Sequence, residues 1–462
     1  MLFNSRLFIL VFLPLTLGGF LALGRRRDLA LWWLLGCSLC FYAWWKPPLL
    51  ALLLGSIAVN YALAGLVRRR AGLAAGLAFN LGLLGWFKYA GMFGVPGIIL
   101  PLGISFFTFQ QIMFLVDLYR GEVQRPRFLD YACFIAFFPH LIAGPIVRPG
   151  HILPQLAALA PRQDVQARLV EGAEIFLLGL AKKIVLADGL SRFADPGFAA
   201  AGRGDAISLI EAWVALLAYA LQIYFDFSGY SDMAIGLARM FSISFPLNFR
   251  SPYQASDISD FWRRWNITLS GFLRDYLYIP LGGNRHGESK RIRNLMITML
   301  LGGLWHGAAW RFVLWGGLHG VFLMIHGWCK GIRMPRRVSW GITLLAVILA
   351  WVPFRATSFA AAVQMYRGLF GLNGLAVPAM LAKVMPFGHV VPVLPWLGDA
   401  RSMSLPQGVL LLALGWFVAL CLPDLHSMGV RRRSIALVAS FAFSMQALFF
   451  APAAIPFLYF QF

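Results

Sequence analysis

Residues 294–329 read NLMITMLLGGLWHGAAWRFVLWGGLHGVFLMIHGWC. This apolar stretch lies between two basic segments, residues 250–293 and Lys330 to Arg337, which the positive-inside rule places on the cytoplasmic side of a membrane. Two complete spans need about 40 residues, but only 36 separate the basic segments. We therefore expect the stretch to enter the membrane and return without a full crossing, or to lie where the bilayer is thinned. Irregular backbone at that depth is tolerated only around an enclosed cavity, which we expect near His306.

The rest of the chain has the composition of a membrane protein. Of its 462 residues, 60% are hydrophobic and 13% are charged, against about 45–50% and about 25% in soluble proteins. This excludes a soluble enzyme, a disordered chain and a secreted disulfide scaffold. Apolar runs near the length of a span recur at residues 7–24, 29–45, 49–67, 73–93, 102–119, 165–189, 206–223, 338–354, 358–375, 405–422 and 434–460. We predict an all-α polytopic membrane protein with about 11–13 membrane helices, some of them broken or re-entrant.

The charge pattern supports this topology. The net charge of +21 comes largely from short arginine clusters between apolar runs, such as Arg25–Arg27 and Arg68–Arg70. This is typical of cytoplasmic loops, so nucleic acid is not an expected partner. The first apolar run is expected to be a retained span with its N-terminus outside, which also places the uncharged 94–101 loop outside.

Two further segments break the regular pattern. Residues 129–147 end in Ala143-Gly144-Pro145, which predicts a broken or re-entrant helix. Residues 224–250 mix Asp226, Asp232 and other polar residues with apolar ones, so this segment should face the protein interior. We expect a single integral-membrane domain over residues 1–462, with a cytoplasmic-side loop at 250–293 and an intramembrane histidine segment at 294–329.

Three of the eight histidines lie in the 294–329 segment: His306, His319 and His326. Ionisable residues at membrane depth are functional candidates. Thirteen residues separate His306 from His319, about 220° around a helix, so both reach one site only if the helix breaks between them. Gly307 is the expected break. The alternative interpretation is a hydrogen-bonded core histidine for His306 and His319, and an interfacial polar residue for His326. No carboxylate or thiolate is placed to complete a metal site, so none is expected.

A second candidate group is Asp260-Phe-Trp-Arg-Arg-Trp-Asn266. On one helix, Trp262 and Asn266 would share a face, with Trp265 adjacent. An interfacial amphipathic helix with snorkelling Arg263 and Arg264 is one interpretation. That interpretation does not account for the polar Asn266 ahead of an apolar run. The position of Asn266 therefore favours a catalytic role for its side-chain amide.

Several of these stretches together carry a resemblance. They are DFWRRWNITLSGFLRDYLYIPLGGNR (260–285), LLGGLWHGAAW (300–310), FFPHLIAGPIVRP (137–149) and QIYFDFSGYSDMAIGLARMF (222–241). With them the chain resembles the membrane-bound O-acyltransferase superfamily, in its bacterial alginate O-acetyltransferase-like branch. The resemblance runs over at least residues 1–375 and is most specific in the middle of the chain.

The resemblance implies helices around a central tunnel that holds a paired Asn and His, here Asn266 and His306. His319 matches a second histidine of this branch. It further implies acetyl-CoA as a donor substrate from the cytoplasm, with no permanently bound cofactor. The resemblance also implies a location in the lipid bilayer of the bacterial inner membrane. It implies periplasmic partners, acetyltransferase- or esterase-like, that acetylate an exopolysaccharide such as alginate or cellulose.

On this basis we expect His306 to act as a general base near neutral pH, Asn266 to donate a hydrogen bond to the oxyanion, and His319 to act as a relay. A covalent acetyl-histidine intermediate is left open. Arg263, Arg264, Trp262 and Trp265 are the candidates for binding CoA. The alternatives are a polytopic transporter, which the lack of an inverted repeat disfavours, and a non-catalytic scaffold of a polysaccharide secretion complex.

Overall fold

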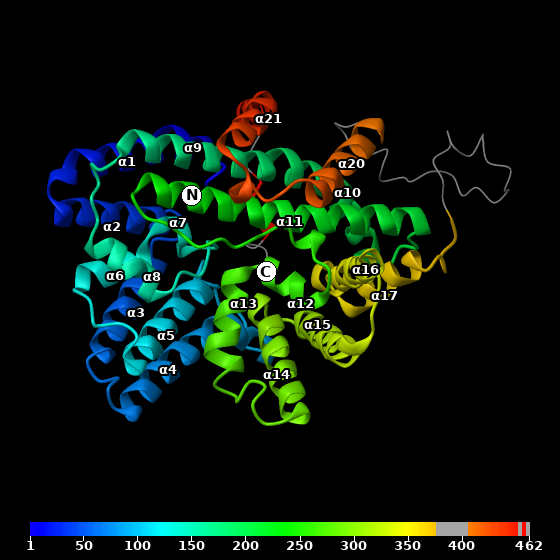
Figure 1. Ribbon diagram of the computed structural model, residues 1–462, viewed down its shortest axis with the longest axis horizontal. Coiled ribbons are helices and arrows are strands. Elements are labelled where there is room, and N and C mark those ends of the chain that lie inside the picture. Colours follow the sequence, from blue (N-terminus) through cyan, green and yellow to red (C-terminus); the bar gives the residue numbers. More distant parts are fainter. Residues whose placement is uncertain (376–404, 451–454, 459–462) are drawn as a thin grey trace.

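The computed structural model describes residues 1–375, 405–450 and 455–458, and these residues form helices and connecting segments without β-strands (Figure 1). The N-terminal helices are α1 (Leu13–Ala22), α2 (Arg27–Ala43), α3 (Leu49–Leu63), α4 (Arg70–Leu84) and α5 (Ile104–Arg120). Each falls within one of the first five predicted spans or overlaps it almost completely. The all-α prediction is therefore confirmed.

The remaining helices follow in three groups. The first group is α6 (Phe128–Ala136), α7 (Phe138–Leu141), α8 (Pro149–Ala157), α9 (Val165–Ala181), α10 (Asp188–Arg203) and α11 (Leu209–Met240). The second is α12 (Ile258–Arg264), α13 (Ile267–Leu273), α14 (Glu288–His306), α15 (Trp310–Trp328), α16 (Arg336–Arg355) and α17 (Phe359–Leu369). The last is α20 (Leu405–Cys421) and α21 (Val430–Phe450). The break predicted within residues 129–147 is present between α6 and α7.

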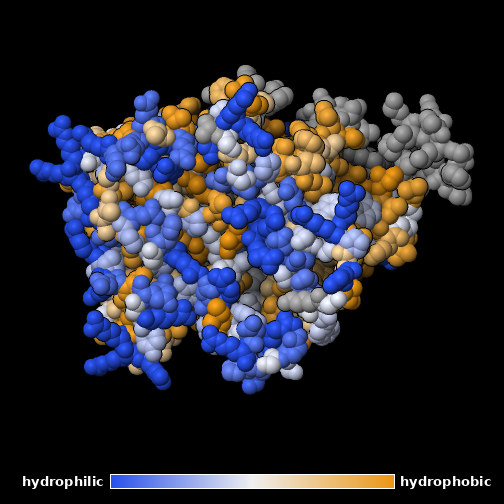
Figure 2. Space-filling view, in the orientation of Figure 1, coloured by the Kyte–Doolittle hydropathy of each residue, from blue (hydrophilic) through white to orange (hydrophobic). Residues whose placement is uncertain are grey.

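Among the residues that the structure describes, four continuous helical runs are individually long and apolar enough to cross a membrane: Phe8–Arg25, Arg70–Phe93, Leu209–Met240 and Arg336–Arg355. Leu49–Leu63 and Gly408–Cys421 are shorter apolar helices. Hydrophobic side chains are exposed on the surface over α20 and beside α17, whereas hydrophilic ones gather over the start of α14 (Figure 2). These features describe a multi-pass membrane protein; the count of 11–13 membrane helices stays a prediction.

Helix α11 is the long central element of the fold (Figure 1). Its 32 residues begin with a capping box between Ser208 and Glu211, and α9 packs along its second half. The two helices meet at glycines: a Cβ on Gly179 would lie 2.7 Å from the carbonyl oxygen of Gly229, and one on Gly236 would lie 2.5 Å from that of Gly172. Small residues of this kind let membrane helices approach closely.

The acidic residues of α11 are buried and paired, which confirms that residues 224–240 face the interior. Lys183 Nζ donates hydrogen bonds to Asp226 at 2.8 Å and to Asp188 at 2.6 Å. Asp232 accepts from Lys182 at 2.6 Å and lies 2.9 Å from the ring of His426. Buried charges are stable only when paired in this way.

Helices α14 and α15 form an antiparallel hairpin. Their backbones touch at two glycines, because a Cβ on Gly303 would lie 2.2 Å from the carbonyl oxygen of Phe312, and one on Gly316 would lie 2.2 Å from that of Met299. Each arm has 19 residues, or about 28 Å of rise, close to the ~30 Å of a bilayer core.

Neither arm is among the helical runs that are apolar enough to cross a membrane in the part of the chain that the structure describes, so the incomplete crossing stays a prediction. Helix α14 starts at Glu288, six residues before the apolar segment defined from the sequence. These six residues are mostly polar, and the sequence analysis therefore assigned them to the preceding loop. The 250–293 segment is likewise more than a loop: it contains α12 and α13, and Phe261, Trp265 and Leu269 are buried against the core. Residues 376–404, which contain Pro386, Pro392 and Pro395 and which we therefore expect to form a connecting loop, lie outside the described residues.

Candidate active site

His306 is the last residue of α14 and is only 6% exposed. Its imidazole packs among Trp305, Trp315 and Phe354, with ring centroids 5.0, 5.0 and 5.1 Å away. The helix ends here because Gly307 is extended. A Cβ on Gly307 would lie 2.2 Å from the Phe312 ring, so this turn has no room for a larger residue. The predicted break at Gly307 is confirmed.

His319 lies on α15 and is fully buried. Its ring centroid is 4.7 Å from that of Trp315 and 5.1 Å from that of Trp262. Trp315 therefore contacts both histidines, and the break in the hairpin brings them to one site despite their positions on two helices.

The site contains buried polar atoms that lack partners. In the part of the chain that the structure describes, no hydrogen bond reaches Nδ1 of His306, either ring nitrogen of His319, Nε1 of Trp262 or Nε1 of Trp315. Buried polar groups in folded proteins are almost always hydrogen-bonded. This concentration does not support the interpretation of His319 as a hydrogen-bonded core residue, and it leaves these groups available to a polar substrate.

Asn266 lies at the junction of α12 and α13, where one prediction was wrong. Helix α12 ends at Arg264, and Asn266 is in the left-handed region with φ 42°, which asparagine tolerates better than most residues. Trp262 and Asn266 therefore do not share a helix face. Backbone hydrogen bonds from Ile267 to Asn248 and from Arg250 to Arg264, both 2.9 Å, hold this turn.

The amide of Asn266 is buried, and its Nδ2 has no partner among the described residues. Its neighbour Trp265 packs against Trp351 with ring centroids 4.9 Å apart, and Trp351 stacks on Trp315 at 5.6 Å. Asn266 is thus linked to the histidines through three tryptophans rather than through a hydrogen bond found in the described structure.

A cavity of about 620 Å³ opens on the side expected to be cytoplasmic. Its charged and aromatic lining consists of Arg148, His151, Arg250, Trp262, Arg263 and Arg274. Trp262 also contacts His319, so this indole separates the cavity from the buried site.

The four residues expected to bind CoA divide into two groups. Trp262 and Arg263 line the cavity. Trp265 is buried in the core, and Arg264 Nε donates to Asp260 at 2.9 Å instead. Partial burial opposes ionisation of the Asp260 carboxyl, but hydrogen bonds from Arg264 and from the Ser256 backbone keep its pKa below the ordinary value.

The sequence placed Arg250 and Arg274 among the basic residues of the 250–293 segment that could bind the CoA phosphates, but it did not single out Arg148. All three lie within or directly beside the quoted motifs, where the positive-inside pattern already accounted for an arginine. Arg148 and Arg274 both pair with Asp275.

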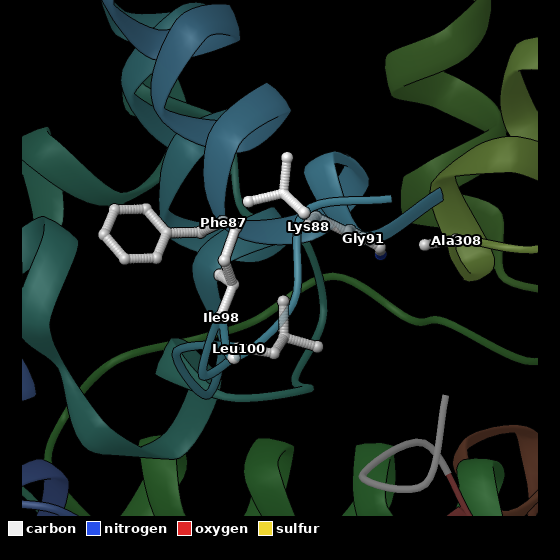
Figure 3. Close-up of a pocket in the computed structure, with 8 residues that line it drawn as sticks. Phe87, Lys88, Gly91, Ile98, Leu100 and Ala308 are labelled. Atoms are coloured by element: carbon white, nitrogen blue, oxygen red, sulfur yellow. The ribbon is translucent and has the colours of Figure 1, made fainter. Parts of the chain in front are cut away.

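A second cavity, of about 280 Å³, adjoins the segment that follows His306. Lys88 and Gly91 from the end of the α4 run line it together with Ala308, two residues after His306 (Figure 3). Lys88 also lines a neighbouring cavity of about 290 Å³. The cavities of about 280 and about 620 Å³ share no lining residue; the first reaches Ala308, two residues after His306, and the other reaches Trp262, which contacts His319. Sequence reasoning missed Lys88 as well.

The described residues include no group of three or more His, Cys, Asp or Glu side chains that could hold a metal ion. The candidate chemistry in this part of the chain rests on imidazole, indole, amide and arginine groups.

Comparison with known proteins gives consistent results. A model of the membrane-bound O-acyltransferase family matches residues 84–361, which include Asn266, His306 and His319. The chain is 42% identical over 430 residues to the peptidoglycan O-acetyltransferase of Helicobacter pylori, covering 82% of this chain and 81% of that protein. It is 37% identical over 513 residues to the probable alginate O-acetylase AlgI of Azotobacter vinelandii, covering 100% of both. The corresponding protein of Pseudomonas aeruginosa is 42% identical over 404 residues, covering 81% of this chain and 75% of the relative.

Proposed function

Because the chain belongs to the membrane-bound O-acyltransferase family and is a membrane-bound O-acetyltransferase, we propose that it takes acetyl from cytoplasmic acetyl-CoA and delivers it across the bacterial inner membrane for O-acetylation of a polysaccharide. The names of its relatives support alginate or another secreted or cell-wall polymer as the acceptor class. The observation that supports the proposal is that Trp315 contacts both His306 and His319, while one cavity is lined by Trp262, which contacts His319, and another by Ala308, two residues after His306.

The larger cavity has the chemistry to hold the donor. CoA carries several phosphate charges, and arginine side chains bind phosphate through paired N–H donors. Arg148, Arg250, Arg263 and Arg274 line this cavity, with Trp262 at its inner wall. A CoA nucleotide bound among the arginines would direct its thioester toward Trp262 and the histidines.

The proposed reaction is a direct transfer to a hydroxyl group. His306 removes the proton from the acceptor hydroxyl as its oxygen attacks the thioester carbonyl. The C–S bond then breaks, and the proton passes to the leaving CoA sulfur. Asn266 donates to the oxyanion, and His319 relays or steadies the charge on His306. If an acetyl-histidine forms first, a ring nitrogen makes the first attack and the hydroxyl makes the second.

The acceptor side is the smaller cavity next to Ala308. A periplasmic partner of the acetyltransferase or esterase-like type would take acetyl there and pass it to the polymer. Direct transfer to a sugar hydroxyl is the alternative route, and both use the same buried histidines.

The test is acetyl transfer by purified protein in detergent, with radiolabelled acetyl-CoA and short oligosaccharides of uronate and glucan type as acceptors. His306→Ala is expected to lower CoA release in the presence of acceptor by about 10²–10⁴-fold, the usual contribution of a general base. His326→Ala is the matched control, because His326 lies on α15 near Asp257 and away from Trp315. Full activity in His306→Ala would overturn the assignment of His306 as the catalytic base.

A further inference from the structure

Lys88 is a buried lysine that the proposed reaction does not use. It lies in the π-helical turn Gly85–Tyr89 that follows α4, and it is 8% exposed. Its Nζ donates to Ser105 Oγ of α5 at 3.0 Å and to the carbonyl oxygen of Trp305, the residue before His306. No carboxylate forms an ion pair with Lys88 within the described ranges.

The neighbouring Tyr89 contacts the same turn of α14. Its hydroxyl donates to the carbonyl oxygen of Leu304 at 3.1 Å. The last four carbonyls of a helix have no partner within the helix, and α14 ends abruptly at His306. Two of these carbonyls, those of Leu304 and Trp305, are therefore capped by side chains from an element more than two hundred residues earlier.

This cap is suited to holding the end of α14 in place. The C-terminal end of a helix carries partial negative charge, which a buried ammonium group stabilises. Lys88 also lies over the Trp305 ring, with Nζ 5.5 Å from its centroid. The Trp305 ring in turn packs against His306, so Lys88 contacts both the backbone and the side chain that precede this histidine.

We propose that Lys88, together with Tyr89, is a positioning pair for His306, which fixes the last turn of α14 and thereby the depth and direction of the imidazole beside the acceptor-side cavity. The inference rests on the proposed function, in which His306 is the reacting base. Displacement of a catalytic group by about 1 Å can cost about 10² in rate. Lys88 lines the proposed acceptor-side cavities, which share no lining residue with the proposed donor cavity.

The test compares Lys88→Met, Lys88→Arg and Tyr89→Phe with Lys46→Met, an exposed lysine expected on the same side of the membrane. Lys88→Met is expected to lower kcat about 10²-fold with the KM for acetyl-CoA unchanged. Lys88→Arg should return kcat toward the wild-type value, because it keeps the charge and the donors. Tyr89→Phe should give a smaller loss of kcat. Lys46→Met should leave both constants unchanged.

The kinetic and stability measurements together distinguish a positioning role for Lys88 from a purely structural one. A purely structural role would lower the yield and the unfolding temperature of Lys88→Met but leave the kcat of the folded fraction unchanged, and that result overturns the inference. If Lys88→Met does not accumulate in the membrane, Tyr89→Phe decides, and an unchanged kcat there overturns it. Activity in His306→Ala would instead reject His306 as the base on which this inference rests, whereas an inactive His306→Ala beside a fully active Lys88→Met would reject only the positioning role.

Discussion

The indole of Trp315 packs edge-on against the imidazole of His306, with ring centroids 5.0 Å apart and an angle of 87° between the planes. The same indole contacts His319 at 4.7 Å, and it is 1% exposed. Trp315 is therefore a buried residue that contacts both histidines and holds them at one site.

Replacement of this buried residue should be costly. Trp315→Ala is expected to destabilise the protein by about 3–5 kcal/mol, the usual cost of emptying a buried tryptophan site, and to lower acetyl transfer. Trp328→Ala is the matched control, because Trp328 ends the same helix and is 60% exposed. Thermal unfolding in detergent measures the difference, and equal stability of the two variants would contradict the packing described for Trp315.

The α14–α15 hairpin contains two adjacent glycines, Gly316 and Gly317, whose replacement should have different effects. Gly316→Ala should separate α14 from α15 and displace His306, because its Cβ would lie 2.2 Å from the carbonyl oxygen of Met299. Gly317→Ala should be tolerated, since its Cβ would meet only the side chain of Leu300 at 3.4 Å. Acetyl transfer and thermal unfolding of both variants test this. A Gly316→Ala protein with wild-type activity would show that the close contact is unnecessary.

Asn266 allows the backbone and the amide to be tested separately. Asn266→Ala removes the amide and places a less tolerant residue at φ 42°, whereas Asn266→Gly removes the amide but suits this conformation. If the amide stabilises the oxyanion, both variants lose about 10²–10³ in kcat. Retention of activity in Asn266→Gly alone would assign the residue a purely conformational role.

If the cavity lined by Arg250 binds CoA, removal of this arginine should change the KM for acetyl-CoA. Arg250→Ala should raise the KM for acetyl-CoA roughly 10- to 100-fold, since a hydrogen bond to a charged group is worth about 1.5–3 kcal/mol. Arg285→Ala is the control, as an exposed arginine of the same 250–293 segment outside the cavity lining. Steady-state kinetics over a range of acetyl-CoA concentrations gives the answer, and an unchanged KM in Arg250→Ala would move the CoA site elsewhere.

The sequence alone was sufficient for features governed by local rules. The spacing of His306 and His319 required a helix break, and Gly307 provides it. Hydropathy located the first five helices, and the polar residues of α11 identified an interior helix. These predictions depend on helix geometry and on the cost of polar groups in lipid, both of which are visible in a single sequence.

Other features depend on partners far away in the chain. Trp262 to Asn266 has helical spacing, but backbone hydrogen bonds to Asn248 and Arg250 end α12 early. Lys88 reads as a lone lysine near the end of a span, and its partner Trp305 lies 217 residues later. The donor cavity likewise combines Arg148 with Arg250 and Arg274, which no local pattern brings together.

The most direct test of His306 as the catalytic base is the acetyl content of extracellular and cell-wall polysaccharides from cells that lack the gene and carry wild type, His306→Ala or His326→Ala at matched membrane levels. We predict that one identifiable polymer loses its acetyl groups with His306→Ala and keeps them with wild type and His326→Ala. Unchanged acetylation of every polymer in the His306→Ala cells would contradict this role.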